Sequence, residues 1–434
     1  LRRNGERHPS RWVIDSALKL GNSNLDLAFT EDSEDWAEFI PSFISGIQNS
    51  KFPATANEHN LAELLSLKQE TGDVADHNLE LLSPFEKGRQ LMMARESSQF
   101  TRFDGNLSGV ITPEGVRVDI ISATRLEAWA KCPHSYFLRH ILGVTETTHP
   151  ETELRITALD RGSLVHEAAD LFLQELINQN SPSLTHHNFS DSEFTRMRQI
   201  GSQVAQDLED KGLTGRPVFW PRDREAILND LRKLLKNDTK RQHIGTIIAS
   251  EFRFGEGHPI HRLLPSGKKV SFRGSADRVE QKPDGNLIVI DYKTGKPKDF
   301  KGLSEQDPTQ RGTKLQLPIY GLAAREMFPN PQTTTHVSYW FTSEAKGEWK
   351  EIGYEITDTV LEKFDAVIES IVIGIESGVF PARPANVASY GEFIDCAYCD
   401  PDGYGTGDLQ KQWEVKSSAI ELADYLQLAE GSDD

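Results

Sequence analysis

The sequence predicts an α/β protein in which helices flank a central β-sheet, preceded by an α-rich N-terminal region. Three observations favour this class. Apolar residues at helical spacing surround a group of extended, β-branched runs, and a tight-turn sequence joins two of those runs. No repeat with a period of about 20–50 residues is present, which excludes a solenoid or a propeller. The 434 residues suffice for two to four domains at about 100–200 residues each.

The composition excludes several classes of protein. With 37% hydrophobic and 26% charged residues, no window approaches the ~18 consecutive apolar residues of a membrane helix. Three cysteines do not make a disulfide framework and no secretion signal is present, so we expect a cytoplasmic protein with no membrane partner. The net charge of −18 gives no global basic field. Because the chain opens on Leu1, we expect it to be part of a longer protein.

The first 118 residues are expected to form a region of their own. Residues 61–67 and 84–95 have helical patterns among acidic loops, and the polar stretch 104–115 is typical of a linker. We therefore place a domain boundary between residues 118 and 119, so that residues 119–434 make the second domain.

Helices are expected at the start of the second domain. Thr124 and Glu127 have the spacing of a capping box, and apolar residues follow at helical intervals. Further helices are expected at residues 161–177, 191–211 and 221–236. Proline stands in the first turn of the last of these helices, where its missing N–H is tolerated.

Strands are expected to follow these helices. Residues 283–286 read Pro-Asp-Gly-Asn between the extended runs 269–281 and 287–293, which predicts an antiparallel hairpin. The other expected elements are strands at 245–254, 334–342 and 349–356, helices at 314–326 and 359–376, and a loop-rich stretch at 378–414 with two of the cysteines.

The second strand of the hairpin ends in Asp291 and Lys293. Side chains two residues apart share a face of a strand, so this carboxylate and this ammonium project together. The apolar run 287–290 anchors the strand in the core. For this pattern alone, a surface ion pair is the structural alternative.

The first strand of the hairpin carries Asp277, which the turn folds toward Asp291. Two converging carboxylates repel each other unless a cation lies between them, and oxygen ligands favour Mg²⁺ or Mn²⁺. The alternative at this point is that Asp277 pairs with Arg278 or Arg273 at the surface.

Two helices contribute further polar residues. His166 lies among apolar neighbours, where a histidine is often a satisfied core residue. Gln316 and Tyr320 are four apart and share a helix face, as a half-buried polar pair would. Each feature is unspecific alone, but together they follow the order G-x-x-x-H, E, G-x-x-D, D-Y-K-T-G and Q-x-x-x-Y.

This order of motifs resembles the RecB-like branch of the PD-(D/E)xK nuclease superfamily. Over residues 122–413 it is most similar to the nuclease domain of AddB-type subunits of bacterial helicase–nucleases. The resemblance implies a restriction-endonuclease-like core with a mixed sheet flanked by helices. It also implies a Mg²⁺ or Mn²⁺ ion held by His166, Asp277, Asp291 and the backbone carbonyl of Tyr292.

Catalytic roles are implied as well. Lys293 would orient and help to activate the attacking water. Gln316 and Tyr320 would border the site, where they contact DNA or position the lysine. Glu251 matches an acidic position on the first core strand, for which a structural role is the alternative. A cation held by carboxylates suits phosphodiester hydrolysis, because it lowers the pKa of bound water and neutralises charge on the phosphate.

Residues 261–301 form a locally basic segment. They contain ten lysines and arginines against five acidic residues, a balance of +5. Such a segment would attract the phosphate backbone of DNA.

The three cysteines resemble part of an iron–sulfur staple. In AddB-type nucleases, one cysteine before the core joins three after it to hold a [4Fe–4S] cluster. Cys132, Cys396 and Cys399 match three of these positions, while the fourth falls on Gly405. Three interpretations stay open: a cluster with a non-cysteine ligand (Asp400, Asp402 or Asp408), a zinc site, or a metal-free relic.

We therefore expect a Mg²⁺- or Mn²⁺-dependent deoxyribonuclease, an exonuclease acting within a helicase–nuclease complex in double-strand-break repair and recombination. Its partners would be DNA and a helicase subunit or a helicase domain of the same complex. Residues 1–118 would be the trailing part of a helicase-like region. The alternative is a noncatalytic DNA-binding or scaffolding module that retains the nuclease fold. The intact set of His166, Asp277, Asp291 and Lys293 favours the enzyme, since a decayed site should have lost at least one.

Overall fold

The computed structural model describes residues 11–21, 40, 42–71, 83–110, 120–145, 153–329, 334–342, 350–383 and 408–430. The chain divides into two compact units, Leu1–Met93 and Ala94–Asp434. This division falls ahead of the boundary expected after residue 118, and residues 111–119 lie outside the described residues. A helicase-like character of residues 1–118 stays a prediction.

The described part of the first unit is helical. Ser42 caps one of its helices, because the Ser42 side chain accepts a hydrogen bond from the backbone N–H of Ser45. The expected helices at 61–67 and 84–95 are confirmed within longer ones. The helices are α1 (Arg11–Gly21), α2 (Phe43–Asn49), α3 (Ala56–Thr71) and α4 (Ser83–Glu96), which runs across the division between the units.

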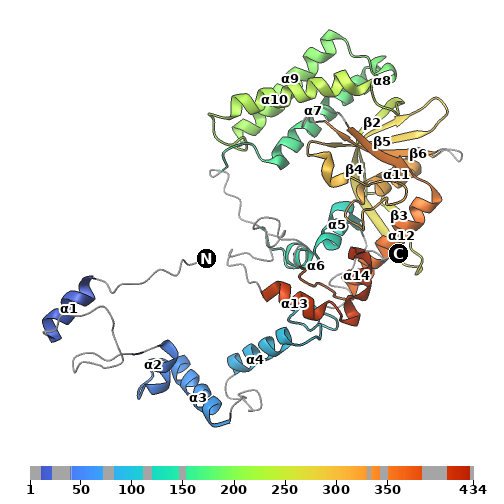
Figure 1. The fold of residues 1–434 in the computed structure, drawn as a ribbon. Helices are drawn as coiled ribbons and strands as arrows, with labels where there is room; N and C mark the ends of the chain where they lie inside the picture. The colour runs from blue at the N-terminus through green and yellow to red at the C-terminus, as the bar shows by residue number, and fades with distance from the viewer. Residues whose placement is uncertain are drawn as a thin grey trace. The chain divides into compact units, whose positions relative to one another are not determined.

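A seven-stranded mixed sheet forms the centre of the described second unit (Figure 1). Its main path is β1-β4-β5-β6-β7, and β2 and β3 both pair with β4. The β1–β4 and β5–β6 pairs are parallel, whereas the others are antiparallel. The strands are β1 (Ile120–Ser122), β2 (Thr246–Phe254), β3 (Ile260–Leu263), β4 (Lys269–Gln281), β5 (Leu287–Lys293), β6 (Thr335–Phe341) and β7 (Lys350–Glu355).

The two faces of the sheet belong to two apolar cores. In β5, Leu287 and Val289 join one core, whereas Ile288 and Ile290 join the other, as the alternation of side chains along a strand requires. The helices α7 (Ala158–Asn178), α8 (Ser183–His186), α9 (Asp191–Asp210) and α10 (Trp220–Asp238) cover the second core (Figure 1). The first core includes α5 (Ala123–Lys131), α11 (Gln316–Met327) and α12 (Asp358–Glu376). The expected helices and strands of the core are thereby confirmed, with shifts of a few residues at their ends.

Two local expectations are wrong. Helix α5 begins at Ala123 with Ser122 as its cap, so Thr124 and Glu127 do not form a capping box. The end of the stretch expected to be loop-rich is helical. It begins α13 (Asp408–Lys416), and α14 (Ala423–Glu430) follows. Short elements complete the described chain: α6 (Pro133–Tyr136), the π-helix η3 (Phe137–Ile141), and the 3₁₀-helices η5 (Pro297–Phe300) and η6 (Ile420–Leu422). None of the described helices combines the length and apolar character needed to cross a membrane.

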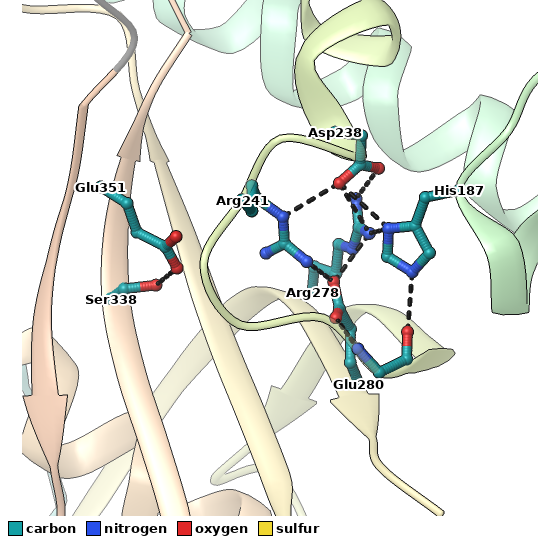
Figure 2. Close-up of polar contacts among 8 residues, drawn as sticks. His187, Asp238, Arg241, Arg278, Glu280, Ser338 and Glu351 are labelled. Atoms are coloured by element: carbon teal, nitrogen blue, oxygen red, sulfur yellow. Dashed lines mark hydrogen bonds and ion pairs between the residues drawn. The ribbon is translucent and has the colours of Figure 1, made fainter.

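A buried network of charged side chains fastens the helical layer to β4 (Figure 2). Arg278 on β4 donates to Asp238 at the end of α10 over 2.8 Å. Arg241 donates to Asp238 over 2.9 Å and also pairs with Glu280. Burial alone would raise the pKa of Asp238, but the Arg278 guanidinium and its other partners hold it below its ordinary value.

His187 completes this buried ion network. Its Nε2 lies 2.7 Å from the carbonyl oxygen of Gly245, and its Nδ1 lies 3.1 Å from Asp238. His187, Asp238 and Glu280 bring metal-type ligand atoms within 4.8 Å of one another. The guanidinium groups of Arg241 and Arg278 already supply positive charge there, so we assign the network a structural role.

Candidate active site

The site begins where β4 and β5 separate. Their ladder ends at the pair Arg278 and Ile290, while β5 continues beside β6 as far as Lys293. Beyond the ladder, the backbone N–H of Tyr292 donates to Asp277 Oδ2 over 2.5 Å. The Asp277 carboxylate therefore fills the fork between the two strands and satisfies an amide that has lost its ladder partner.

Asp277 is buried and shares its carboxylate with His166. His166 Nδ1, on α7, lies 2.9 Å from Asp277 Oδ1. Burial, together with the negative charge of Asp291, raises the pKa of Asp277 to about 6. Burial alone would lower the pKa of His166, but the hydrogen bond to Asp277 and the nearby carboxylates raise it. A histidine and two carboxylates thus share one electrostatic environment.

The surface pairing considered for Asp277 is wrong. Arg278 is fully buried on the opposite face of β4, where it contacts Asp238. Asp277 is 7% exposed and is held by His166 and Tyr292.

Lys293 lies at the end of a chain of polar contacts. Its ammonium forms an ion pair with Asp291 and donates to Gln316 Oε1 over 2.9 Å. The Gln316 amide in turn donates to the Tyr320 hydroxyl over 3.4 Å. The ammonium also lies 4.9 Å from the centre of the Tyr339 ring. These contacts fix the position of the lysine while 23% of its side chain stays exposed.

Glu251 joins the site through an unusual backbone conformation. It lies within β2 at φ +44°, in the left-handed region that residues other than glycine rarely adopt. Its carboxylate accepts a hydrogen bond from Ser275 Oγ over 2.7 Å. Ligand atoms of Glu251, His166 and Asp277 all lie within 4.8 Å of one another. Strain of this kind clusters at functional sites.

The structure rearranges the expected ligand set. His166 and Asp277 are in contact as expected, and Glu251 joins them, whereas the Asp291 carboxylate pairs with Lys293. For Tyr292, the contact is made by the amide, and a role for its carbonyl stays a prediction. Carboxylate oxygens with one imidazole form a donor set that suits Mg²⁺ or Mn²⁺. The residues present therefore fit a small divalent cation.

Not every cation of the basic segment 261–301 faces solvent. Arg278 is buried in the ion network. Arg262 pairs with Asp365, and Lys268 pairs with Glu376. Lys296 and Lys298 are exposed, and attraction of DNA phosphates by this segment stays a prediction.

Glu127 belongs to this region, although the sequence pointed to it only as a member of the expected capping box. Its Oε1 accepts a hydrogen bond from the backbone N–H of Leu315 over 2.6 Å, at the residue that precedes α11. Burial raises its pKa, although Leu315 and nearby lysines, including Lys293, act in the opposite direction. Glu127 therefore positions the start of the helix that carries Gln316 and Tyr320.

Of the three cysteines expected to share a metal site, Cys132 lies among the described residues. Cys132 is buried and caps α6, since its Sγ accepts a hydrogen bond from the backbone N–H of Ser135 over 3.4 Å. Cys396 and Cys399 lie outside the described residues. A shared cluster, a zinc site and a relic all stay predictions.

A comparison with protein families matches residues 120–402 to the PD-(D/E)XK nuclease superfamily. The matched span contains every residue of the site described above, from Glu127 and His166 to Tyr320. It also contains all three cysteines.

Curated relatives named as the B-type subunit of an ATP-dependent helicase/deoxyribonuclease are similar to part of the chain. The protein of Symbiobacterium thermophilum is 30% identical over 223 residues, which cover 48% of this chain and 18% of that relative. The protein of Anoxybacillus flavithermus is 28% identical over 181 residues, 40% of this chain and 15% of the relative. The protein of Clostridium perfringens is 26% identical over 242 residues, 52% of this chain and 20% of the relative. The chain thus spans a fifth or less of the length of these relatives.

Proposed function

Because this chain belongs to the PD-(D/E)XK nuclease superfamily, we propose that it is a deoxyribonuclease that uses Mg²⁺ or Mn²⁺. The family match and the mixed sheet flanked by helices confirm the predicted fold class. The observation that carries the proposal is the fork between β4 and β5. There His166, Asp277 and Glu251 converge beside Asp291 and Lys293.

The proposed ion would be held by His166, Asp277, Asp291 and Glu251. When bound, Mg²⁺ or Mn²⁺ supplies positive charge that acidifies a water molecule and neutralises the phosphate. Asp277 is prepared for this role because the Tyr292 amide and His166 fix its two oxygens. The Tyr292 amide would keep Asp277 in place when the ion replaces its contact with His166.

Lys293 would supply the second positive group. Asp291 and Gln316 hold its ammonium at the strand end, and its exposed part can reach a phosphate oxygen. In that position the ammonium can orient the attacking water and stabilise negative charge on the phosphate. Gln316 and Tyr320 position the lysine, with Glu127 fixing the start of their helix.

We also propose a larger assembly. The relatives are named as helicase/deoxyribonuclease subunits, so this nuclease would act on DNA beside a helicase subunit or helicase domain. An exonuclease activity in double-strand-break repair and recombination follows from that placement, as does a cytoplasmic location.

The test of the proposed activity is cleavage of linear DNA in Mg²⁺ or Mn²⁺. Lys293→Ala and Asp291→Ala should each lower the cleavage rate by on the order of 10²–10³-fold or more, the scale of losing one charge-stabilising group. Lys236→Ala, which removes an exposed lysine of α10, is the matched control and should cleave at the parental rate. Equal rates for all four proteins would overturn the assignment and favour a noncatalytic DNA-binding module.

A further inference from the structure

A second cluster of ligand-type side chains lies at the opposite end of β6. It joins His243, which precedes β2, to His336 on β6 and Glu355 on β7, and their ligand atoms all lie within 4.8 Å of one another. His336 and Glu355 are direct partners in the β6–β7 ladder. The rings of His243 and His336 are stacked with their centres 3.8 Å apart, so the half-buried His243 ring would have to turn before both rings point at one ion.

Polar atoms of this cluster are buried without hydrogen bonds. His336 is 8% exposed, and its Nδ1 has no hydrogen-bond partner in the described chain. This atom approaches Glu355 Oε1 to 3.4 Å without forming a hydrogen bond. Oε2 of Glu355 and Oε2 of Glu351 are also buried and have no hydrogen-bond partner among the described residues. Each such atom costs about 1–3 kcal/mol when it is left unsatisfied, so together they form a polar site that water or a bound ligand would satisfy.

We propose that His243, His336 and Glu355 bind a divalent transition-metal ion of the Zn²⁺ class, at a site separate from the nuclease centre. Two imidazoles and one carboxylate form a donor set that zinc uses. With zinc bonds of about 2.0–2.2 Å, two ligands of a tetrahedral ion lie roughly 3.4 Å apart, which matches the His336–Glu355 separation.

The surrounding charges permit a cation. An imidazole binds metal in its neutral form. The charge of Arg241 is balanced by Asp238 and Glu280, as Figure 2 shows. Lys282 opposes a cation, whereas Glu351 and Glu355 favour one.

An ion can reach the cluster from solvent. A pocket opens onto it, lined by the two histidines, both glutamates, Gln242 and Glu305, among others. The pocket leaves room for a water molecule as a fourth ligand. A bound ion would tie the segment before β2 to β6 and to the edge strand β7.

The sheet separates this site from the nuclease centre. His336 pairs with Ile288 in the β5–β6 ladder, whereas Asp291 pairs with Tyr339, three residues and therefore about 10 Å farther along. His336 also shares its face of β6 with Trp340, in the core of α7–α10, while Tyr339 lies in the other core. The two sites therefore do not share ligands.

The test is a Zn²⁺ titration of the full chain by isothermal calorimetry. The protein is first stripped of metal and its cysteines are alkylated, and saturating Mg²⁺ is present to fill sites that prefer hard cations. The parent should bind one more equivalent of Zn²⁺ than His336→Gln or Glu355→Gln. His258→Gln, which removes an exposed histidine, is the matched control and should bind as the parent does. Equal Zn²⁺ stoichiometry in parent and both cluster variants would overturn the proposal.

Two further measurements keep the result interpretable. Zn²⁺ should raise the melting temperature of the parent but not that of Glu355→Gln, whose partly exposed side chain makes misfolding a minor concern. Asp277→Asn combined with His336→Gln should bind one Zn²⁺ equivalent fewer than Asp277→Asn alone. Failure of the nuclease proposal is thereby distinguished from failure of this one. Equal Zn²⁺ binding by these two proteins would overturn the second site.

Discussion

Strand β4 carries two polar clusters of opposite character on its two faces. On one face, Asp277 meets Asp291 and His166, and the pKa of Asp277 is raised. On the other face, Arg278 and Glu280 join the buried ion network with Asp238, whose pKa is lowered. Both clusters contain buried carboxylates, but among the described residues only the network contains guanidinium groups that balance them.

The balance of charge distinguishes the ion network, which is structural, from the nuclease fork, where we propose an ion. In the ion network, each charge has a partner of opposite sign, so folding itself satisfies the carboxylates. At the nuclease fork, negative charge exceeds what Lys293 and His166 supply, and the surplus leaves the site short of a cation. On β4, the buried carboxylate with the raised pKa therefore lies where we propose an ion, whereas Asp238, with its lowered pKa, lies in a completed set of contacts with β4.

The largest expected effect is on the stability of the network. Glu280→Gln removes a negative charge that pairs with Arg241 and Arg278 and also accepts the N–H of Gly245 over 2.8 Å. Because positive charge is left buried without balance, the free energy of unfolding should fall by about 3–5 kcal/mol. Urea denaturation measures this loss. Cleavage per folded molecule should not change, and a loss of under about 1 kcal/mol would show that the network is not structural.

Asp277→Asn should instead lower cleavage and raise stability. The amide keeps the shape of the side chain and can still accept from Tyr292, but it removes a carboxylate proposed to hold the ion. Cleavage should fall by on the order of 10²–10³-fold. Without metal, the variant should be more stable than the parent at neutral pH by about 1–3 kcal/mol, since the charge it removes is unfavourable in the fold. A variant that is less stable than the parent and still cleaves DNA would show that Asp277 has a structural role, like the charges on the other face of β4.

The pH dependence of metal activation is the next largest effect. A proton on Asp277, whose pKa is about 6, competes with the cation. Below about pH 6, half-maximal cleavage should therefore require roughly tenfold more Mg²⁺ for each pH unit. The folded state holds this proton more tightly than the unfolded chain, whose carboxyl has a pKa of about 3.9. Asp277 thus makes the metal-free protein less stable as the pH rises from about 4 to about 6.

Mg²⁺ titrations of the cleavage rate between about pH 5 and about pH 8 measure this requirement. Urea denaturation of the metal-free parent and of Asp277→Asn between about pH 4 and about pH 6 measures how much Asp277 changes the free energy of unfolding. A constant Mg²⁺ requirement across the range would contradict the assignment of Asp277 as a ligand.

The site could be anticipated because its signals are local. The alternation of β5 places Asp291 and Lys293 on one face, and the turn at 283–286 brings β4 back beside it. Helical spacing likewise puts Gln316 and Tyr320 on one face of α11. In a strand every second side chain shares a face, and in a helix side chains about 3.6 residues apart do. Which residues lie together therefore follows from the local sequence alone.

Contacts between distant segments could not be anticipated from local spacing, and the contact of His166 with Asp277, 111 residues away, was expected only from the family resemblance. Glu127 and Leu315 are 188 residues apart, and Arg278 and His187 are 91 apart. Local spacing even misled in two places, since Glu127 had the position of a cap residue and Arg278 that of a surface partner for Asp277. The partner of a buried charge is decided by packing, which no short window of sequence contains.

The smallest expected effect tests the strain at Glu251. A residue other than glycine pays about 1–2 kcal/mol in the left-handed region, which glycine does not. Both Glu251→Gly and Glu251→Ala lose the bond to Ser275, so their difference isolates the backbone at φ +44°. The glycine variant should therefore be more stable than the alanine variant by about 1 kcal/mol in urea denaturation. An alanine variant of equal or greater stability would show that this conformation is unstrained. If Glu251 helps to hold the ion, cleavage should fall equally in both, whereas a purely structural role predicts that cleavage follows stability instead.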